Sequence, residues 1–598
     1  MATFLRLLGF LRDHKRGVWW SCGLAALAMG ATVAIPALTG AAVSAIRDGD
    51  GDRLELVAAG IALAGLLRVA LTVARRLIAG RVSLGVELDL RNRVYDHLLS
   101  LELGFFDGQQ TGQLMSRATV DLQAVRFFLG YGLVFILQAA LTILFAGAAM
   151  FVIDPGLAAI ALFPVPFVVW IAQRYGRRSR PALQEVQQRI AELTADAEEN
   201  VGGVRVVKAF AREERQFTRF HGSVDRVFDQ SMISTRLRAF YNPLIGLLPQ
   251  LGLAALLFLG GRAVIDGRLS LGEFTAFYTY LLALLAPMRS LGITLGMAQR
   301  ATASGARLFE LLDRQPRIVA APGAPPLPEG SGRVELRGVS LRYDDASASS
   351  SQLKPALRDV SLTVEAGTTL ALVGATGSGK TTLVQLVSRL YDPTAGQVLV
   401  DGVDVRTVDH RALRSEIAVV TDDPFLFSAS VHHNIAYSRG GRDGASREEV
   451  VAAARRAQAH EFIERLPDGY DTRVGERGLT LSGGQRQRIA IARALLGDPR
   501  ILVLDDATSS VDASTEQAIK QALREVMAGR TTFVIAHRLS TIALADEIVV
   551  LDGGELLARG THEELLQSSP FYREIVEKGL PDQVFLNRKP REREVAGL

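Results

Sequence analysis

A chain of 598 residues is too long for a single hydrophobic core, so length alone predicts two or more domains. Hydrophobic residues make up 48% of the chain and the formal net charge is only +4, a balance that does not indicate nucleic acid as a partner. The single cysteine, Cys22, excludes an intrachain disulfide framework and a cysteine-based metal site. Apolar residues are concentrated in the first half and charged residues in the second, which predicts a membrane half joined to a soluble half.

The first half contains six apolar stretches that predict membrane-spanning helices. They are residues 17–46, a run from about residue 54, and residues 127–153, 155–173, 239–261 and 274–288. The basic residues Arg6, Arg12, Lys15 and Arg16 precede the first stretch, so the positive-inside rule predicts a cytoplasmic N-terminus. The first stretch is too long for the apolar region of a signal peptide. We therefore expect a multi-pass protein of the cell membrane, with the lipid bilayer as a partner and the soluble half in the cytoplasm.

Two charged excursions of about sixty residues separate the second span from the third and the fourth from the fifth. Their composition favours helix and predicts helical extensions into the cytoplasm. Each excursion contains a break, at residues 103–112 and 200–205, where two long helices can reverse through a short crossing helix. Arg68 lies at predicted membrane depth, which makes it a functional candidate, and we expect it to line a wet inner cavity together with Arg75 and Arg76.

A proline-rich stretch, AAPGAPPLPEG at residues 320–330, cannot continue a helix and predicts an extended connector. The expected organisation is a transmembrane domain at 1–319, a linker at 320–332, a nucleotide-binding domain at 333–578 and a charged tail at 579–598. Within the soluble part, strand and helix patterns alternate, which is typical of an α/β domain. The polar insert 344–352 is expected at a hairpin tip. The predicted fold class is a six-span helical domain followed by an α/β domain with a phosphate-binding loop.

The sequence GATGSGKTT at residues 374–382 fills every position of the phosphate-binding pattern G-x-x-x-x-G-K-[ST]. An apolar run at 369–373 predicts a buried strand before it, and the spacing of leucines and valines predicts a helix after it. Glycines let successive backbone N–H groups converge on phosphate oxygens at the start of that helix. The candidate nucleotide-binding residues here are Gly374, Ala375, Thr376, Gly377, Ser378, Gly379, Lys380, Thr381 and Thr382.

A second apolar strand, residues 501–505, ends in the carboxylate of Asp505 and is followed directly by Asp506. A parallel strand that ends in acids at this position is typical of a site for a magnesium nucleotide. Asp505 is expected to hold Mg²⁺ through water, and the hydroxyl of Thr381 is expected to ligate the same ion.

Between these two motifs lies a Gly-rich stretch made of Leu481, Ser482, Gly483, Gly484 and Gln485, followed by a basic helix at 486–496. A glycine-rich start of a helix predicts a second anion site. With these three motifs in this order after six apolar spans, the chain resembles ATP-binding cassette transporters of the exporter type, which carry one membrane domain and one nucleotide-binding domain per chain. The resemblance extends from the first span to about residue 578.

The resemblance implies roles for further residues, with ATP and Mg²⁺ as the ligands. Tyr343 matches the aromatic residue that stacks on adenine, and His537 matches the switch histidine. Residues 474–476 match the short loop that touches the membrane domain, and residues 509–512 match the D-loop. In the membrane half, residues 105–117 and 204–210 resemble the two intracellular stretches that dock on nucleotide-binding domains. In the family the 481–485 stretch closes on the γ-phosphate held by the opposite subunit, so one chain cannot complete a site.

Two positions differ from the family pattern, and both affect hydrolysis. Asp506 stands where active sites carry Glu, and Asp422 stands where a Gln usually reaches magnesium and water. The carboxylate of Asp falls about 1 Å short of the attacking water, a displacement that costs on the order of 10²-fold in rate. Asp422 can ligate Mg²⁺ but cannot donate a hydrogen bond. The candidate catalytic residues are Asp506, His537 and Asp422, and the candidate magnesium ligands are Thr381, Asp422 and Asp505.

These departures resemble the degenerate subunit of a heterodimer, which binds ATP and turns it over slowly at its own site. We therefore expect a second, non-identical half-transporter as partner, with the intact 481–485 stretch completing that partner's site. A homodimer with two slow sites and a channel-like subunit gated by ATP remain as alternatives. A soluble cassette ATPase of the repair kind would lack the six spans, and nucleic acid is not an expected partner.

Overall fold

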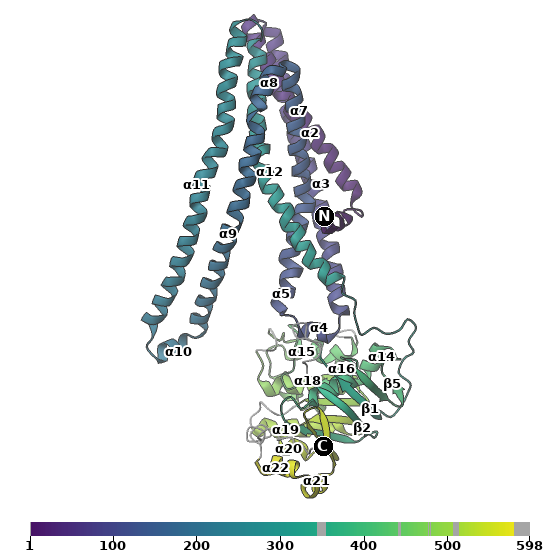
Figure 1. Cartoon of the computed structure of the whole chain (residues 1–598). Helices are drawn as coiled ribbons and strands as arrows, with labels where there is room; N and C mark the ends of the chain where they lie inside the picture. The colour runs from purple at the N-terminus through teal and green to yellow at the C-terminus, as the bar shows by residue number, and fades with distance from the viewer. Residues whose placement is uncertain are drawn as a thin grey trace, which may run out of the picture. The chain divides into compact units, whose positions relative to one another are not determined.

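The computed structural model describes residues 2–343, 355–440, 444–475, 478, 480–505, 513–536 and 538–578. The chain forms two compact units, one made of Met1–Leu99 with Gly112–Arg314 and the other of Ser100–Thr111 with Gln315–Leu598. The first unit is helical and the second is an α/β unit (Figure 1). Residues 100–111, which contain the first predicted break, therefore belong to the unit that carries the nucleotide motifs. The predicted hairpin tip at 344–352 lies outside the described residues.

The first unit consists of long helices with short connections. Its elements are α1 (Ala2–Gly9), α2 (Lys15–Asp48), α3 (Gly51–Ser100), α5 (Thr111–Ser116), η1 (Arg117–Asp121), α6 (Leu122–Phe127), η2 (Phe128–Gly132), α7 (Leu133–Ile153), α8 (Pro155–Leu162), α9 (Pro164–Gly202), α10 (Val204–Ala209), α11 (Glu213–Ile265) and α12 (Leu271–Leu312). The helices α9 and α11 pack side by side, and the short α10 connects them at the second predicted break (Figure 1).

Five helical segments are long and apolar enough to cross a membrane, judged by length and composition. They are Lys15–Asp48, Gly51–Ser100, Thr111–Ile153, Pro155–Gly202 and Glu213–Ile265. The sixth predicted span, residues 274–288, lies inside α12, so the helical architecture agrees with the expected six-span domain.

Local chemistry explains where these helices begin and end. The side chain of Asp154 accepts a hydrogen bond from the backbone N–H of Leu157 at 2.9 Å, and Pro155 occupies the first helical position of α8. At the start of α12, Ser270 and Glu273 form a reciprocal capping box. The hairpin at Asp154 and Pro155 that the sequence predicts is therefore present.

Small residues allow α2 and α12 to approach closely. A Cβ atom on Gly40 would collide with the carbonyl oxygen of Gly272, and one on Gly272 would collide with that of Gly40. The hydroxyl of Tyr280 on α12 donates a 2.9 Å hydrogen bond to the carbonyl oxygen of Val33 on α2. Close backbone contact and an interhelical hydrogen bond replace the hydrophobic effect as the cause of association within a bilayer.

The three arginines of α3 do not share one surface, contrary to the prediction. Arg75 is 3% exposed, whereas Arg68 and Arg76 are exposed. Adjacent positions on a helix point about 100° apart, which separates Arg75 from Arg76. Arg75 therefore points into the helical packing of its unit.

The second unit contains two sheets. The antiparallel sheet has the order β2-β1-β4-β5, and the other sheet has the order β10-β9-β3-β8-β7-β6, parallel except for β10. The strands are β1 (Val334–Leu341), β2 (Leu357–Val364), β3 (Thr369–Gly374), β4 (Ala395–Val400), β5 (Val403–Asp404), β6 (Ile417–Val420), β7 (Ile501–Asp505), β8 (Thr531–Ile535), β9 (Glu547–Asp552) and β10 (Glu555–Gly560).

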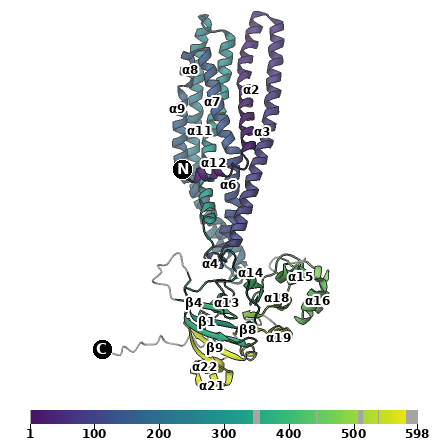
Figure 2. The ribbon, with the colours of Figure 1, turned by 90° about the vertical axis from the view of Figure 1, so that its right-hand side faces the viewer.

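Helices cover these strands and form a separate cluster beside them. The helical elements are α4 (Leu103–Asp107), α13 (Lys380–Val387), α14 (His410–Ser415), α15 (Val431–Ala436), η3 (Tyr437–Arg439), α16 (Arg447–Arg456), α17 (His460–Glu464), η4 (Gly469–Asp471), α18 (Gly483–Gly497), α19 (Ala513–Met527), α20 (Leu539–Ile542), α21 (His562–Ser568) and α22 (Pro570–Lys578). Figure 2 shows α15, α16 and α18 grouped to one side of the strands, and these helices contact one another.

The central strand β3 separates two hydrophobic cores. Leu370 and Leu372 belong to the core shared with the antiparallel sheet and α13. Ala371 and Val373 belong to the core shared with α18 and α19. Successive strand residues point to opposite faces, so a continuous apolar run is needed where both faces are covered. The predicted buried parallel strand before the phosphate-binding loop is confirmed.

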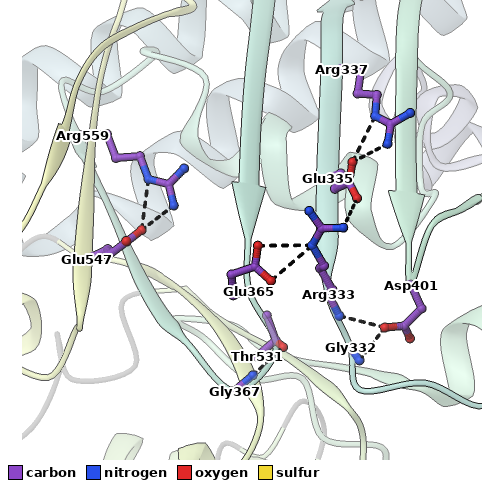
Figure 3. Close-up of polar contacts among 10 residues, drawn as sticks. All are labelled: Gly332, Arg333, Glu335, Arg337, Glu365, Gly367, Asp401, Thr531, Glu547 and Arg559. Carbon is purple, nitrogen blue, oxygen red and sulfur yellow. Dashed lines mark hydrogen bonds and ion pairs between the residues drawn. The ribbon is translucent and has the colours of Figure 1, made fainter.

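Asp401 ties the start of β1 to the turn after β4. One carboxylate oxygen accepts hydrogen bonds from the backbone N–H groups of Gly332 at 2.8 Å and Arg333 at 2.9 Å (Figure 3). The other accepts from Arg500 Nη1 at 3.1 Å. The side chain of Asp401 is only 10% exposed. Loss of this carboxylate would leave the backbone N–H groups of Gly332 and Arg333 without this acceptor and would remove one of the acceptors of Arg500, which also donates to Glu416 and to the carbonyl oxygen of Pro328.

We expect Asp401→Ala to destabilise the second unit by roughly 2–3 kcal/mol, because unsatisfied buried donors cost about 1–3 kcal/mol. For a unit of this size the unfolding temperature should fall by about 4–12 °C. Calorimetry of the full-length protein in detergent measures this shift. Glu365→Ala is the control, because Glu365 pairs with Arg333 at 3.2 Å on the surface (Figure 3) and a surface pair contributes about 0–1 kcal/mol. Equal shifts for the two variants would contradict the assigned role.

Candidate functional site

The phosphate-binding loop connects β3 to α13 and depends on its glycines. A Cβ atom on Gly374 would collide with the carbonyl oxygen of Leu551, and one on Gly379 would come within 2.7 Å of the carbonyl oxygen of Ala356. Gly377 and Gly379 have φ of +79° and +100°, a region that favours glycine. Gly379 is also the N-cap of α13, so the loop ends at the N-terminus of a helix, the position at which helices bind anions.

Lys380 is held inside this loop. Its ammonium group donates hydrogen bonds to the carbonyl oxygens of Gly374 and Ala375, both at 2.8 Å, and the residue is 5% exposed. The Lys380 side chain therefore folds back against Gly374 and Ala375, the first residues of the loop. This geometry keeps the charge beside the cradle in which a phosphate would lie.

Strand order brings the other candidate acids to the same edge of the sheet. Val420 at the end of β6 pairs with Leu504 in β7, and Asp505 at the end of β7 pairs with Ile535 in β8. Because β3 lies on the other side of β8, the phosphate-binding loop emerges from the same carboxyl edge. Asp422, two residues beyond β6, is exposed in the bend that follows that strand. Asp505, Asp422 and the loop are thus gathered at one edge.

Tyr343 lies next to the helix that follows the phosphate-binding loop. Its hydroxyl is 2.9 Å from Thr382 Oγ1 and donates to Gln385 Oε1 at 3.3 Å. Burial raises the pKa of Tyr343, so its hydroxyl stays protonated and available as a donor. The structure therefore brings the predicted adenine-stacking residue and the predicted phosphate-binding residue Thr382 together.

The 481–485 stretch builds the N-terminus of the fifteen-residue helix α18. Ser482 Oγ accepts from the backbone N–H of Gln485 at 3.3 Å, and Gln485 Oε1 accepts from the N–H of Ser482 at 2.9 Å. This capping box leaves Gly483 and Gly484 as the first two helical residues, where side chains would otherwise cover the backbone N–H groups. Leu481 is buried and anchors the turn in the core beneath.

The same helix α18 also holds the segment that follows β6. Arg486 Nη2 donates to Asp423 Oδ1 at 3.2 Å, Gln487 Nε2 donates to the carbonyl oxygen of Thr421 at 3.4 Å, and Arg493 Nη1 donates to that of Phe425 at 3.2 Å. Three side chains of α18 thus hold the segment on either side of Asp422, two of them through backbone carbonyl oxygens and one through the carboxylate of Asp423. A movement of this segment would be transmitted to the 481–485 stretch through these contacts.

The two predicted docking stretches fold as short helices. In α4, Phe105 is 6% exposed and packs edge-on against Phe106 with ring centroids 5.2 Å apart. The hydroxyl of Tyr391, which belongs to the same unit, donates to the carboxylate of Asp107. In the other unit, Phe210 follows α10 and is 72% exposed.

Some predicted site residues lie outside the described part of the chain. These are the candidate catalytic residues Asp506 and His537, the predicted D-loop at 509–512, and Glu476 of the predicted contact loop at 474–476.

Sequence reasoning missed the contact between Tyr391 and Asp107. The two residues are 284 positions apart, and no spacing rule pairs them. The available signal was weak: Tyr391 begins a Tyr-Asp-Pro turn after α13, where an aromatic residue has no obvious role in a helix or strand.

Comparisons with known proteins agree with this geometry. Residues 18–288 match the ABC transporter transmembrane region and residues 357–509 match the ABC transporter family domain. The "ATP-dependent lipid A-core flippase" of Syntrophus aciditrophicus is 38% identical over 95% of this chain and 92% of its own length. The "Multidrug efflux ATP-binding/permease protein Rv0194" of Mycobacterium tuberculosis is 39% identical over 99% of this chain but only 49% of its own length.

Among solved structures, that of a bacterial Atm1-family ABC exporter with ATP bound is similar, with a TM-score of 0.78 and 32% identity over 95% of this chain and 99% of that chain. Both predicted halves are therefore present in the predicted order, and the second carries the cassette that binds ATP. The chain belongs to the ABC transporter family, as an exporter-type half-transporter whose ATPase activity is coupled to membrane transport.

Proposed function

We propose that this chain is one subunit of an ATP-driven exporter of the cell membrane, paired with a second, non-identical half-transporter. The observation that carries the proposal is the set of carboxylates at the nucleotide edge: Asp505 ends β7, Asp422 lies two residues beyond the adjacent strand β6, and Asp506 follows Asp505 in the sequence. The pattern lacks both the Gln and the Glu that hydrolytic sites of this family carry. The chain's own site then binds ATP and hydrolyses it slowly.

The residues at this edge fit a magnesium nucleotide. Thr381 in the first turn of α13 offers a hydroxyl, and Asp505 and Asp422 offer carboxylates, which are the hard oxygen ligands that Mg²⁺ prefers. Bound Mg²⁺ would neutralise charge on the β- and γ-phosphates. Within the cassette, Lys380 and the loop N–H groups bind and orient these phosphates, and Tyr343 holds the adenine by stacking.

Dimerisation is supported by the two docking helices. Phe105 is buried in the unit that contains this chain's cassette, whereas Phe210 of the other unit is an exposed aromatic side chain. An exposed phenylalanine at the end of a crossing helix is available to pack against an apolar partner surface. Exposed Phe425 and Phe427, with ring centroids 5.2 Å apart, offer such a surface on a cassette. We assign the α10 contact to the cassette of the second subunit.

A dimer is also compatible with the length of one relative. The chain spans 49% of the mycobacterial efflux protein, which leaves room for a second half in that polypeptide.

By the positive-inside rule, the N-terminus and the cassette of this chain lie in the cytoplasm. Because relatives are described as a lipid flippase and a multidrug efflux protein, we extend the proposal to an amphipathic substrate, which stimulation of ATPase activity by amphipathic compounds would test.

We expect Lys380→Ala to weaken ATP binding at this chain's site about 10- to 100-fold, because the loop keeps its backbone cradle but loses a charge-assisted phosphate contact. Titration of the purified full-length protein with a fluorescent ATP analogue measures the affinity. Arg465→Ala is the control, since it removes a positive charge whose side chain is 78% exposed on the same unit. Equal affinities for Lys380→Ala and the control would refute the phosphate assignment.

Phe105→Ala should uncouple ATP hydrolysis from transport, because it removes the buried aromatic side chain of α4, the docking helix that belongs to the same compact unit as the cassette. Transport in proteoliposomes should fall several-fold more than ATPase activity. Phe217→Ala removes an exposed phenylalanine from α11 and should change neither. A loss of transport and hydrolysis in equal proportion, or no loss at all, would rule out the docking role.

The asymmetry of the complex is tested by two substitutions in this chain. Gly483→Gln places a side chain at the start of α18 while the capping box of Ser482 and Gln485 remains, so it should abolish most ATPase activity by blocking the partner's site. Asp506→Asn removes a carboxylate that is already too short to reach the attacking water. Total ATPase activity should therefore fall less than about twofold. Steady-state ATPase assays of the complex separate the cases, and a near-complete loss in Asp506→Asn would indicate a homodimer.

A further inference from the structure

The last residue of the docking helix α4 is hydrogen-bonded to one tyrosine of the cassette. The Tyr391 hydroxyl donates to the Asp107 carboxylate. The Tyr391 ring lies against the backbone of the same helix, since a Cβ atom on Gly104 would come 3.0 Å from Cε1 of that ring. Residues 100–111 and the cassette belong to one compact unit, so these contacts lie within a single body.

The same tyrosine also contacts the predicted adenine-stacking residue. The rings of Tyr391 and Tyr343 meet edge to face, with centroids 5.1 Å apart and an interplanar angle of 87°. Edge-to-face packing is the geometry that aromatic quadrupoles favour. The body of Tyr391 also packs against the hydrophobic core that includes α13, so its ring has a fixed support.

Tyr343 in turn reaches the helix that follows the phosphate-binding loop. Its hydroxyl is 2.9 Å from Thr382 Oγ1 in the first turn of α13. A continuous series of contacts therefore runs from Asp107 through Tyr391 and Tyr343 to Thr382.

Electrostatics keep the first contact of this series in place. Burial, and then the neighbouring carboxylate of Asp107, raise the pKa of Tyr391. The phenol stays protonated throughout the physiological range, so it acts as a permanent donor to the Asp107 side chain. A hydrogen bond to a charged acceptor is stronger than a neutral one.

We propose that Tyr391 is a positioning residue for adenine recognition: Asp107 of the docking helix fixes the Tyr391 ring, and that ring holds Tyr343 in the orientation that stacks on the base. The inference rests on the proposed role of Tyr343 and adds a direct contact path from a docking helix to the base of the nucleotide. Coupling of binding free energies is reciprocal, so bound adenine must also stabilise the docked position of α4.

The test compares a ligand that has a base with one that has none. Apparent affinities of the purified full-length complex are measured for ATP and, by competition, for inorganic tripolyphosphate, both with Mg²⁺. Tyr391→Phe keeps the ring and removes only the hydroxyl, and Asp107→Ala removes its acceptor. Each should weaken ATP binding about three- to tenfold, less than the full effect of a hydrogen bond to a charged group because the change reaches the base only through Tyr343, and leave tripolyphosphate unchanged. The double variant should bind ATP as either single variant does.

Two further variants separate the possible outcomes. Tyr437→Phe removes the hydroxyl of a half-exposed tyrosine elsewhere on the cassette and should change neither affinity. Tyr343→Ala should weaken ATP alone, and failure to do so would refute the proposed adenine role itself. If Tyr343→Ala behaves as expected, unchanged ATP affinity in Tyr391→Phe or Asp107→Ala, additive losses in the double variant, or equal losses for ATP and tripolyphosphate would each overturn the positioning role.

Discussion

The nucleotide site depends on one steric constraint, the close approach of the phosphate-binding loop to the neighbouring strand β9. Gly374 lies directly against the carbonyl oxygen of Leu551 and has no room for a side chain. The turn after β9 adds a hydrogen bond from the N–H of Gly554 to the carbonyl oxygen of Ser378 at 3.2 Å. The loop is thus clamped by backbone on one side and by the N-terminus of α13 on the other. Its N–H groups are aimed before any ligand arrives, which reduces the ordering cost of binding.

Two series of side-chain contacts lead away from the edge of the sheet at which the nucleotide site lies. The segment around Asp422 is fastened to α18 through Arg486, Gln487 and Arg493, so the two anion-binding motifs of one cassette are mechanically linked. The other series leads from Thr382 through the two tyrosines to α4. In the proposed dimer these connections allow the occupancy of one nucleotide site to be sensed both by the partner's site and by the membrane domain. Each connection is short and made of packed side chains, which gives a physical route for such coupling.

Much of this architecture could be predicted because it follows from local patterns. The phosphate-binding loop, the strand before it, the capped start of α18 and the hairpin at Asp154 are each encoded within a few consecutive residues. Long-range pairings could not be predicted in the same way. Nothing local indicates that Asp401 accepts from Gly332 and Arg333, that Tyr391 donates to Asp107, or which of the adjacent residues Arg75 and Arg76 is the buried one. Such contacts depend on how distant elements pack, and periodicity carries no information about that. The assignments of Asp506 and His537 remain predictions.

The central claim is that this half-transporter works beside a different chain whose site performs most of the hydrolysis. The most direct measurement is native mass spectrometry of the complex purified from its own host through a tag on this chain. The account predicts one copy of this chain with one copy of a second half-transporter, and that second chain should carry Glu at the position that corresponds to Asp506. A complex containing two copies of this chain and no other half-transporter would contradict it.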